Sequence, residues 1–207
     1  MQIPLQLQTV QIEEHTVQLY VPEPGVIKNR FANGSLQDPY WSQVWPASRA
    51  LAEFLLTHPQ LVKEKTVLEL GAGLGLPSLT IAPLVHTVTC TDKMPDAVAV
   101  CAHSALLNGF SNFFTAVLDW SELPPDLNTD VVLLSDVNYE QQSFTTLLSV
   151  LNRFLLEGKQ VILATPQRLM AKDFIGSLVP FVRQQHQYQI NEGSSSTWIT
   201  VLFLQNL

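Results

Sequence analysis

Three glycines occupy alternate positions directly after an acidic residue that ends an apolar run. The stretch is TVLELGAGLGLPSL, residues 66–79, in which Glu69 is followed by Gly71, Gly73 and Gly75. Glycine lets the backbone adopt left-handed conformations and lets another group approach it closely. A turn of this kind between a strand and a helix also presents free N–H groups that carry partial positive charge. We therefore take this turn as the first candidate for a ligand site.

The glycine spacing distinguishes between two classes of cofactor. Dinucleotide sites follow G-x-G-x-x-G and place a pyrophosphate at the helix end. Here Gly75 is followed by Leu76 and Pro77, so the third glycine of that pattern is missing. An acid such as Glu69 would oppose a pyrophosphate but would suit an ammonium group. S-adenosylmethionine carries an ammonium group, a sulfonium cation and no phosphate, so the pattern favours it over a nicotinamide cofactor.

Two further acids end the next strand-like runs. Asp92 follows the run 87–91, and Asp119 follows the run 113–118 and precedes Trp120. A carboxylate can accept hydrogen bonds from both hydroxyls of a ribose, which suits Asp92. Ligands in open α/β sheets bind at the carboxyl ends of the strands. Together with the glycine turn, these acids predict one cofactor site.

The elements that would position this site alternate along the chain from residue 66. The alternation predicts an α/β fold, Rossmann-like and doubly wound, with a seven-stranded and mostly parallel sheet. The last two strands are joined by glycine and serines, and they predict an antiparallel hairpin at one edge. The expected strands are 66–70, 87–91, 113–118, 130–135, 160–164, 186–191 and 197–205, and the expected helices are 76–84, 96–108, 142–156 and 170–184.

The N-terminal part has a different pattern. Period-two alternation over residues 3–21 predicts two strands, and a change of parity between Leu7 and Val10 predicts a bulge or bend in the first. Residues 22–40 have the proline, glycine and asparagine content of a loop. Pro46 then opens an amphipathic helix.

We expect one compact domain overall. Residues 1–60 would form an N-terminal hairpin, loop and helix that cover the cofactor site, and residues 61–207 would form the core.

Composition limits the class of protein. The 207 residues are 46% hydrophobic and 14% charged, which suits a folded core. The net charge of −7 argues against nucleic acid as a partner. The stretch MQIPLQLQTV lacks the basic region and apolar core expected of a signal peptide, and no apolar run approaches the roughly 20 residues that a membrane helix needs. Cys90 and Cys101 lack metal-binding spacing. We therefore expect a cytoplasmic monomer with no metal and no nucleic-acid or membrane partner.

Several stretches resemble a known family. E-L-G-A-G-L-G, residues 69–75, resembles motif I of the seven-strand methyltransferases. The stretches D-P-Y-W-S-Q-V-W-P at 38–46, L-D-W at 118–120 and S-D-V-N-Y-E at 135–140 resemble the family 16 methyltransferases, many of which methylate lysines of non-histone proteins. The first stretch is closest to the branch that includes the lysine methyltransferase of the electron-transfer-flavoprotein β subunit. The resemblance covers most of residues 38–168.

The resemblance implies roles at the cofactor. S-adenosylmethionine would be the methyl donor and S-adenosylhomocysteine the product. Glu69 and the glycines would lie against the methionine part and the ribose, and Asp119 would accept the adenine amino group. The remaining cofactor-binding residues would be Trp45, Asp92, Lys93, Trp120 and Ser135.

The resemblance also implies an acceptor site. The family signature D-x-x-Y is matched by Asp136 and Tyr139, which would face the acceptor. Asn138 stands between them, where relatives often have an apolar or aromatic residue, and this departure bears on the shape of the acceptor pocket. The acceptor implied is a lysine side chain of a protein. A small-molecule amine and a non-catalytic cofactor-binding module stay open as alternatives. The absence of an N/D-P-P-Y/F motif argues against a nucleic-acid methyltransferase.

Overall fold

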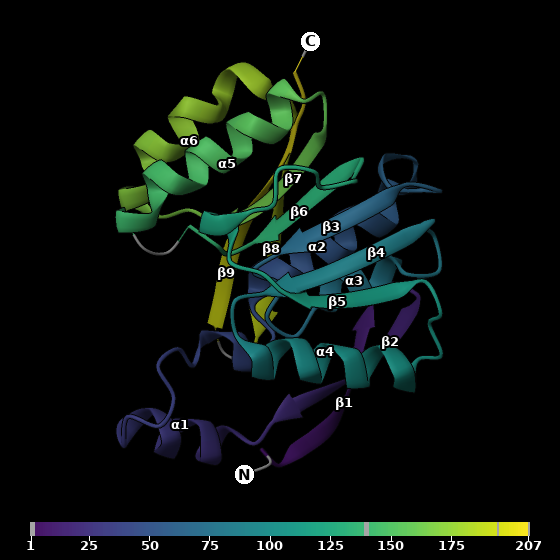
Figure 1. Ribbon diagram of the computed structural model, residues 1–207, viewed down its shortest axis with the longest axis vertical. Coiled ribbons are helices and arrows are strands. Elements are labelled where there is room, and N and C mark those ends of the chain that lie inside the picture. Colours follow the sequence, from purple (N-terminus) through teal and green to yellow (C-terminus); the bar gives the residue numbers. More distant parts are fainter. Residues whose placement is uncertain (1–2, 139–140, 194, 207) are drawn as a thin grey trace.

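A seven-stranded sheet forms the centre of the computed structural model, which describes residues 3–138, 141–193 and 195–206 (Figure 1). The strand order is β5-β4-β3-β6-β7-β9-β8. Strands β3 to β7 run parallel, and β9 is antiparallel to both of its neighbours, which confirms the expected sheet with its C-terminal edge hairpin. The strands are β3 (Thr66–Leu70), β4 (Thr87–Asp92), β5 (Phe113–Val117), β6 (Val131–Ser135), β7 (Gln160–Pro166), β8 (Val182–Glu192) and β9 (Ser195–Leu204).

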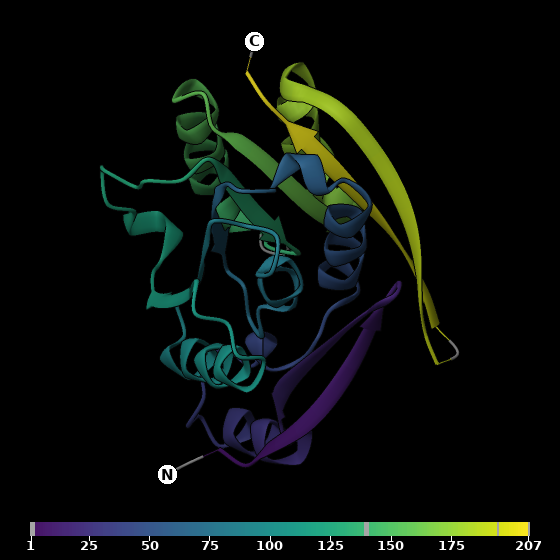
Figure 2. The ribbon, with the colours of Figure 1, turned by 90° about the vertical axis from the view of Figure 1, so that its right-hand side faces the viewer.

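Helices cover both faces of the sheet (Figures 1 and 2). Alternate residues of one strand point to opposite faces, and β6 shows this directly. Leu133 packs with the helices α2 and α3, whereas Leu134 packs with α5 and α6. A strand buried on both faces reads as an unbroken apolar run, as VVLL does here. The helices are α2 (Pro46–Thr57), α3 (Leu76–Ile81), α4 (Pro95–Leu107), α5 (Phe144–Leu156) and α6 (Lys172–Leu178).

The direction of winding reverses between β3 and β6. From β3 the chain builds outward through β4 to β5, and it then returns to place β6 on the other side of β3. The loops that follow β3 and β6 therefore diverge at the carboxyl edge of the sheet. Open α/β sheets bind ligands at such a switch point.

The N-terminal hairpin consists of β1 (Leu5–Ile12) and β2 (His15–Pro22). Its register is uninterrupted, so the predicted bulge is wrong. Leu7 lies on the outer face of the hairpin with 52% of its surface exposed, while Val10 and Ile12 are buried on the inner face. The parity changes because Leu7 is an exposed apolar residue, and not because the strand contains an extra residue. The hairpin packs on α4, where the Tyr20 N–H donates to Ser104 Oγ at 3.0 Å.

Other element boundaries also differ from those expected. Residues 24–32 form a helix, α1 (Pro24–Ala32), where we predicted a loop. Pro24 occupies a first-turn position that tolerates proline, but Ile27 is the only buried residue of this helix, so no apolar stripe marked it. The expected helix 170–184 ends at Leu178, because a 3-10 turn containing Pro180 leads directly into β8.

Short 3-10 turns complete the described structure. They are η1 (Tyr40–Ser42), η2 (Pro59–Leu61), η3 (Trp120–Glu122), η4 (Gln141–Ser143), η5 (Leu169–Ala171) and η6 (Val179–Phe181). No helix among the described residues is long and apolar enough to span a bilayer.

Candidate active site

The three glycines after β3 adopt left-handed backbone conformations. Gly71, Gly73 and Gly75 have φ angles of 63°, 55° and 70°, a region that other residues adopt only with strain. A Cβ atom on Gly71 would lie 3.1 Å from the Trp120 ring, and one on Gly75 would lie 2.5 Å from Cys101 Sγ. The glycines are therefore required both by the turn and by the groups packed against it.

Glu69 lies behind this turn. It is fully buried on β3, and its Oε2 accepts hydrogen bonds from the backbone N–H and the hydroxyl of Ser78 on α3. Burial raises the pKa of the Glu69 carboxyl to about 7. Glu69 does not line the pocket in front of the turn. The contacts described here tie β3 to the start of α3, and so fix the two ends of the glycine turn.

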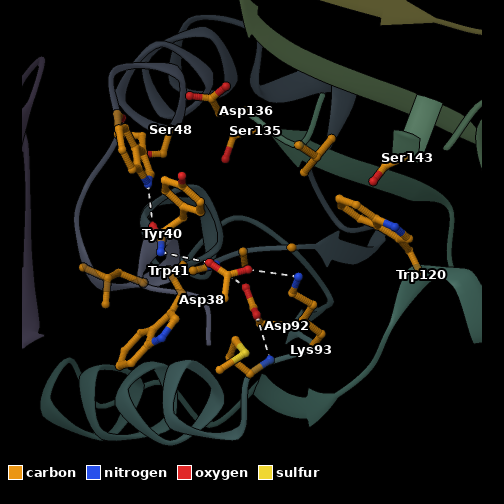
Figure 3. Close-up of a pocket in the computed structure, with 18 of the residues that line it drawn as sticks. Asp38, Tyr40, Trp41, Ser48, Asp92, Lys93, Trp120, Ser135, Asp136 and Ser143 are labelled. Atoms are coloured by element: carbon orange, nitrogen blue, oxygen red, sulfur yellow. Dashed lines mark hydrogen bonds and ion pairs between the residues drawn. The ribbon is translucent and has the colours of Figure 1, made fainter. Parts of the chain in front are cut away.

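A pocket of about 500 Å³ opens at the carboxyl edge of the sheet (Figure 3). In this view Ser135 and Asp136 lie on one side of the pocket and Asp92 and Lys93 on the other. Of the residues predicted from the sequence, Glu69 and Asn138 do not line it, and Tyr139 lies outside the described residues. Those that do are Trp45, Gly71, Gly73, Gly75, Asp92, Lys93, Asp119, Trp120, Ser135 and Asp136.

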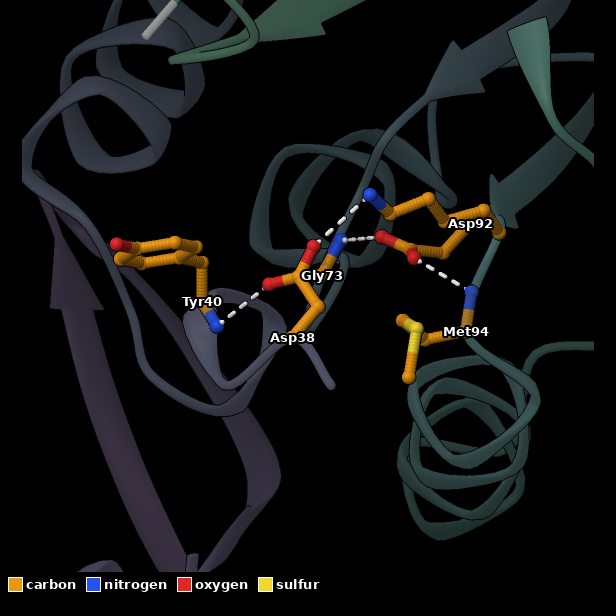
Figure 4. Close-up of polar contacts among 6 residues, drawn as sticks. Asp38, Tyr40, Gly73, Asp92 and Met94 are labelled. Carbon is orange, nitrogen blue, oxygen red and sulfur yellow. Dashed lines mark hydrogen bonds and ion pairs between the residues drawn. The ribbon is translucent and has the colours of Figure 1, made fainter. Parts of the chain in front are cut away.

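Asp92 is held at the end of β4 by two backbone donors. Its Oδ2 accepts from the Gly73 N–H and its Oδ1 from the Met94 N–H, each at 2.9 Å (Figure 4). The side chain is mostly buried, and this burial raises its pKa. Each carboxylate oxygen has a further lone pair, so Asp92 can accept from two ligand hydroxyls while it keeps its backbone bonds.

Asp119 and Trp120 lie together on a third side of the pocket. Asp119 Oδ1 accepts from the Ser121 N–H at 2.9 Å and from Ser121 Oγ at 2.7 Å. The backbone hydrogen bond from Ser121 is the main reason that the pKa of Asp119 is lowered. Trp120 follows at the first position of η3, with its ring beside Gly71. This side offers a carboxylate next to an aromatic face.

The segment before α2 forms a wall of the pocket. Lys93 Nζ and Asp38 Oδ2 form an ion pair at 2.9 Å, and Asp38 Oδ1 accepts from the Tyr40 N–H at 3.0 Å (Figure 4). Trp45 Nε1 donates to the Tyr40 carbonyl oxygen at 2.7 Å. Sequence reasoning did not assign a role to Asp38 or Tyr40, although both belong to the D-P-Y-W stretch that carried the resemblance.

An ion pair lies at the carboxyl end of β6. Arg168 Nη1 is 2.5 Å from Asp136 Oδ1, and both residues line the pocket. Asp136 has a φ of 55°, and its N–H donates to the Ala164 carbonyl oxygen at 2.9 Å. Sequence reasoning missed Arg168, because no motif surrounds it and because it reaches Asp136 only through the pairing of β6 with β7.

Asn138 points away from the pocket. It is fully buried, and its Oδ1 accepts from Thr165 Oγ1 at 2.8 Å. Its Nδ2 has no hydrogen-bond partner in the part of the chain that the structure describes. In this structure Asn138 packs against the end of β7 and does not shape the pocket wall.

The charges that line the pocket fit S-adenosylmethionine. Among the described lining residues there are four carboxylates and two basic groups, and each basic group is paired with one of the carboxylates. A phosphate would find no unpaired basic group there, whereas an ammonium group and a sulfonium cation suit the acidic balance. No group of three or more His, Cys, Asp or Glu among the described residues could hold a metal ion.

Solved structures share this fold. The N-methyltransferase NodS from Bradyrhizobium japonicum, in complex with S-adenosylhomocysteine, aligns with a TM-score of 0.62 at 17% identity, covering 87% of this chain and 97% of that one. The Thermus thermophilus 16S rRNA methyltransferase RsmC aligns with a TM-score of 0.68 at 15% identity, covering all of this chain and 52% of that one. The architecture is that of the Rossmann-like methyltransferases.

A family model described as lysine methyltransferase matches residues 33–179, which include the glycine turn, Asp92, Asp136 and Arg168. The chain therefore belongs to this family.

Two curated relatives show the range of the family. The histone-arginine methyltransferase METTL23 of Xenopus laevis is 36% identical over 57% of this chain and 53% of its own length. The electron transfer flavoprotein beta subunit lysine methyltransferase of Rattus norvegicus is 30% identical over 75% of this chain and 58% of its own length. The chain thus spans little more than half the length of either relative, and their names differ in the acceptor residue.

Proposed function

We propose that this chain is an S-adenosylmethionine-dependent methyltransferase and that it acts on a lysine side chain of a protein other than a histone. The observation that carries the proposal is the paired carboxylate, Asp136 with Arg168, on the side of the pocket opposite Asp92. The description of the family model and the similarity to the rat lysine methyltransferase support a lysine acceptor.

Different residues would bind the cofactor and orient the acceptor. The cofactor supplies an electrophilic methyl group on its sulfonium. Asp92 and the backbone of Gly73 would hold its ribose and methionine parts, and Trp120 would flank its adenine. Asp136 would orient the acceptor amine, since a carboxylate accepts the N–H bonds of an amine. Holding the nucleophile and the methyl carbon roughly 3–3.5 Å apart makes the transfer effectively unimolecular.

A lysine acceptor has to be neutral to react. Its ordinary pKa is about 10.4, so deprotonation at pH 7 costs about 4–5 kcal/mol. Removal from water favours the neutral amine and lowers this cost, and a neighbouring cation lowers it further. Trp45 and Trp120 provide apolar surface in the pocket wall, and the sulfonium of the bound cofactor is such a cation.

Arginine is the second candidate acceptor, because METTL23 is named for it. A guanidinium stays charged at neutral pH and is bound best by a carboxylate in a two-point contact. Asp136 already forms an ion pair with Arg168, which favours lysine over arginine. A small-molecule amine is the third candidate, since it would meet the same pocket.

Labelled S-adenosylmethionine tests these candidates. The protein is incubated with the labelled cofactor and a lysate of the source organism, with the Asp92→Ala variant as a cofactor-binding control. Histones, other proteins and small molecules are then separated, and the protein fractions are hydrolysed in acid. Methyl-lysine in the non-histone fraction is the expected result. Methyl-arginine, label in histones alone or label only in small molecules would each overturn the proposal.

A further inference from the structure

Arg168 belongs to none of the motifs found in the sequence, yet it lines the pocket beside Asp136. It comes from the segment after β7, and its Nη1 lies 2.5 Å from Asp136 Oδ1. The Arg168 side chain is 29% exposed and that of Asp136 only 12%, so the pair lies at the wall and not on the open surface. Arg168 is therefore placed to act on the charge and the orientation of the Asp136 carboxylate.

The backbone of Asp136 strengthens the case. Its φ of 55° is uncommon for a residue with a side chain, and such conformations cluster at functional sites. Among the described residues it is held by the bond from its N–H to the Ala164 carbonyl oxygen and by the ion pair with Arg168. The carboxylate is therefore fixed in direction as well as compensated in charge.

An uncompensated carboxylate would hinder the reaction on an amine. It would stabilise the ammonium form of the acceptor, which has no lone pair to attack the methyl group. A guanidinium beside the carboxylate removes this penalty and leaves the hydrogen-bonding oxygens in place. The other charged residues among the described pocket lining are Asp38, Lys93, Asp92 and Asp119, and the first two are paired with each other.

We infer that Arg168 is a positioning and specificity-determining residue, which compensates the charge of Asp136 so that the acceptor site favours an amine arriving neutral over a permanently charged guanidinium. This inference rests on the proposed lysine methylation. Arg168 acts through Asp136 and through the charge of the site.

The test compares the wild type with two variants at Arg168. Arg168→Met removes the charge, and Arg168→Lys keeps it. The probe is the protein fraction of the source lysate at a fixed low concentration, where the initial rate of methyl-lysine formation reports kcat/KM. Rates are measured from pH 6.5 to 9.5. Arg183→Met, on the exposed edge strand β8 and outside the pocket lining, serves as the matched control.

Arg168→Met is expected to lower the rate about tenfold at pH 7 and less than about threefold at pH 9.5, because each unit of acceptor pKa changes the neutral fraction tenfold only well below that pKa. Arg168→Lys is expected to keep the wild-type pH profile within about threefold, since its ammonium group carries the same charge. The ratio of methyl-arginine to methyl-lysine should rise in Arg168→Met. Affinity for S-adenosylmethionine should change less than twofold in both variants, which excludes a folding defect.

The double variant Asp136→Asn, Arg168→Met removes both charges. Its rate is low because Asp136 is absent, but its pH profile should return to the wild-type shape. A deficit in Arg168→Met that is equal at every pH, or a Lys variant that behaves as the Met variant does, would overturn the inference and leave lysine methylation intact. If the wild type forms no methyl-lysine, the proposed function fails first and the inference fails with it.

Discussion

The carboxylate of Asp38 and the ammonium group of Lys93 lie 2.9 Å apart and join two distant parts of the chain. Asp38 belongs to the segment before α2, and Lys93 directly follows Asp92 (Figure 4). The same carboxylate accepts from the Tyr40 N–H, and Tyr40 in turn accepts from Trp45. The pair thus connects a wall of the pocket to the strand end that carries Asp92.

Breaking this pair should loosen the wall without unfolding the protein. Asp38→Asn is expected to accelerate amide hydrogen exchange over residues 38–45 and to weaken S-adenosylmethionine binding roughly threefold to tenfold, or about 1 kcal/mol. Unfolding free energy should fall by no more than about 1 kcal/mol, because Lys93 is half exposed. Hydrogen exchange with mass spectrometry and titration calorimetry measure the two effects.

The matched control is Glu157→Gln. It breaks the 3.0 Å ion pair with Arg153 on α5, which lies outside the pocket lining. We expect it to change neither exchange over residues 38–45 nor cofactor affinity. An Asp38→Asn variant with wild-type exchange in that segment would show that the wall is held by other contacts.

Asp92 should determine cofactor affinity. Asp92→Ala removes the acceptor proposed for the ribose hydroxyls and also frees the N–H groups of Gly73 and Met94. We expect the dissociation constant for S-adenosylmethionine to rise at least about thirtyfold, since hydrogen bonds to a charged group each contribute about 1.5–3 kcal/mol. Calorimetry measures it, and Asp130→Asn, an acid that binds the Thr66 N–H at the other end of the sheet, is the control. Unchanged affinity in Asp92→Ala would contradict the ribose assignment.

Local sequence signals predicted the sheet well. The run VVLL in β6 is apolar at every position because both of its faces are buried, and this is visible without a structure. The expected helix 96–108 corresponds to α4, and the sequence marks it with Pro95 at its start and Gly109 beyond its end. Helix α1 was missed because it buries only Ile27. A helix with one buried residue has no apolar periodicity that could reveal it in the sequence.

Only the part of the site that lies within sequence motifs could be predicted. The ends of β3, β4 and β5 each placed a predicted group at one edge of the sheet, as parallel strands require. The direction of individual side chains was not predictable. Glu69 faces α3 and Asn138 faces Thr165, and both follow from tertiary packing. Arg168 meets Asp136 because β6 and β7 are neighbours, which no local pattern records.

Asp136 should affect turnover and not cofactor binding. Asp136→Asn keeps a side chain that tolerates the left-handed backbone and removes the charge. We expect kcat to fall at least about a hundredfold, comparable to the loss of a positioned catalytic group, with the dissociation constant for S-adenosylmethionine within about threefold of wild type. Single-turnover kinetics and calorimetry separate the two. Asp173→Ala, an exposed acid on α6, is the control, and an equal loss of binding and turnover at Asp136 would indicate a structural role.

Gly75 should be required for packing as well as for the turn. A Cβ atom there would lie 2.5 Å from Cys101 Sγ and 2.8 Å from Cys90 Sγ, so Gly75→Ala is expected to lower the unfolding free energy by about 2–4 kcal/mol. Gly109→Ala has a similar φ of 73° but open space around the added atom, and it should cost only about 1–2 kcal/mol. Urea unfolding measures both.

Replacing the obstructing thiol distinguishes the two causes. Cys101→Ala removes the Sγ nearest to the added Cβ, so the combination with Gly75→Ala should be more stable than the sum of the single effects predicts. Strict additivity would mean that the contact with Cys101 adds nothing to the cost, which would then come from the positive φ and the contact with Cys90.

Glu69 should make the stability of the ligand-free protein fall as pH rises. Its pKa is raised from an ordinary 4.5 to about 7 in the folded state, mainly by burial. Between these values the folded state holds a proton that the unfolded state has released, so stability is highest at or below pH 4.5 and is lost as pH rises through 7. Over this pH range one such group changes the unfolding free energy by about 3 kcal/mol in total.

Glu69→Gln keeps the shape of the side chain and an oxygen for the Ser78 N–H, but it cannot ionise. The variant should therefore lack the loss of stability that ionisation of Glu69 causes. Its unfolding free energy relative to wild type should rise by about 3 kcal/mol between pH 4.5 and pH 8. Urea unfolding at intervals of half a pH unit measures the difference, and taking it between two variants cancels the opposite contribution of Asp119. Glu157→Gln, which replaces the acid directly after α5, is the control substitution. If Glu69→Gln runs parallel to wild type, the carboxylate is ionised in the folded protein across this range, and burial does not control its charge.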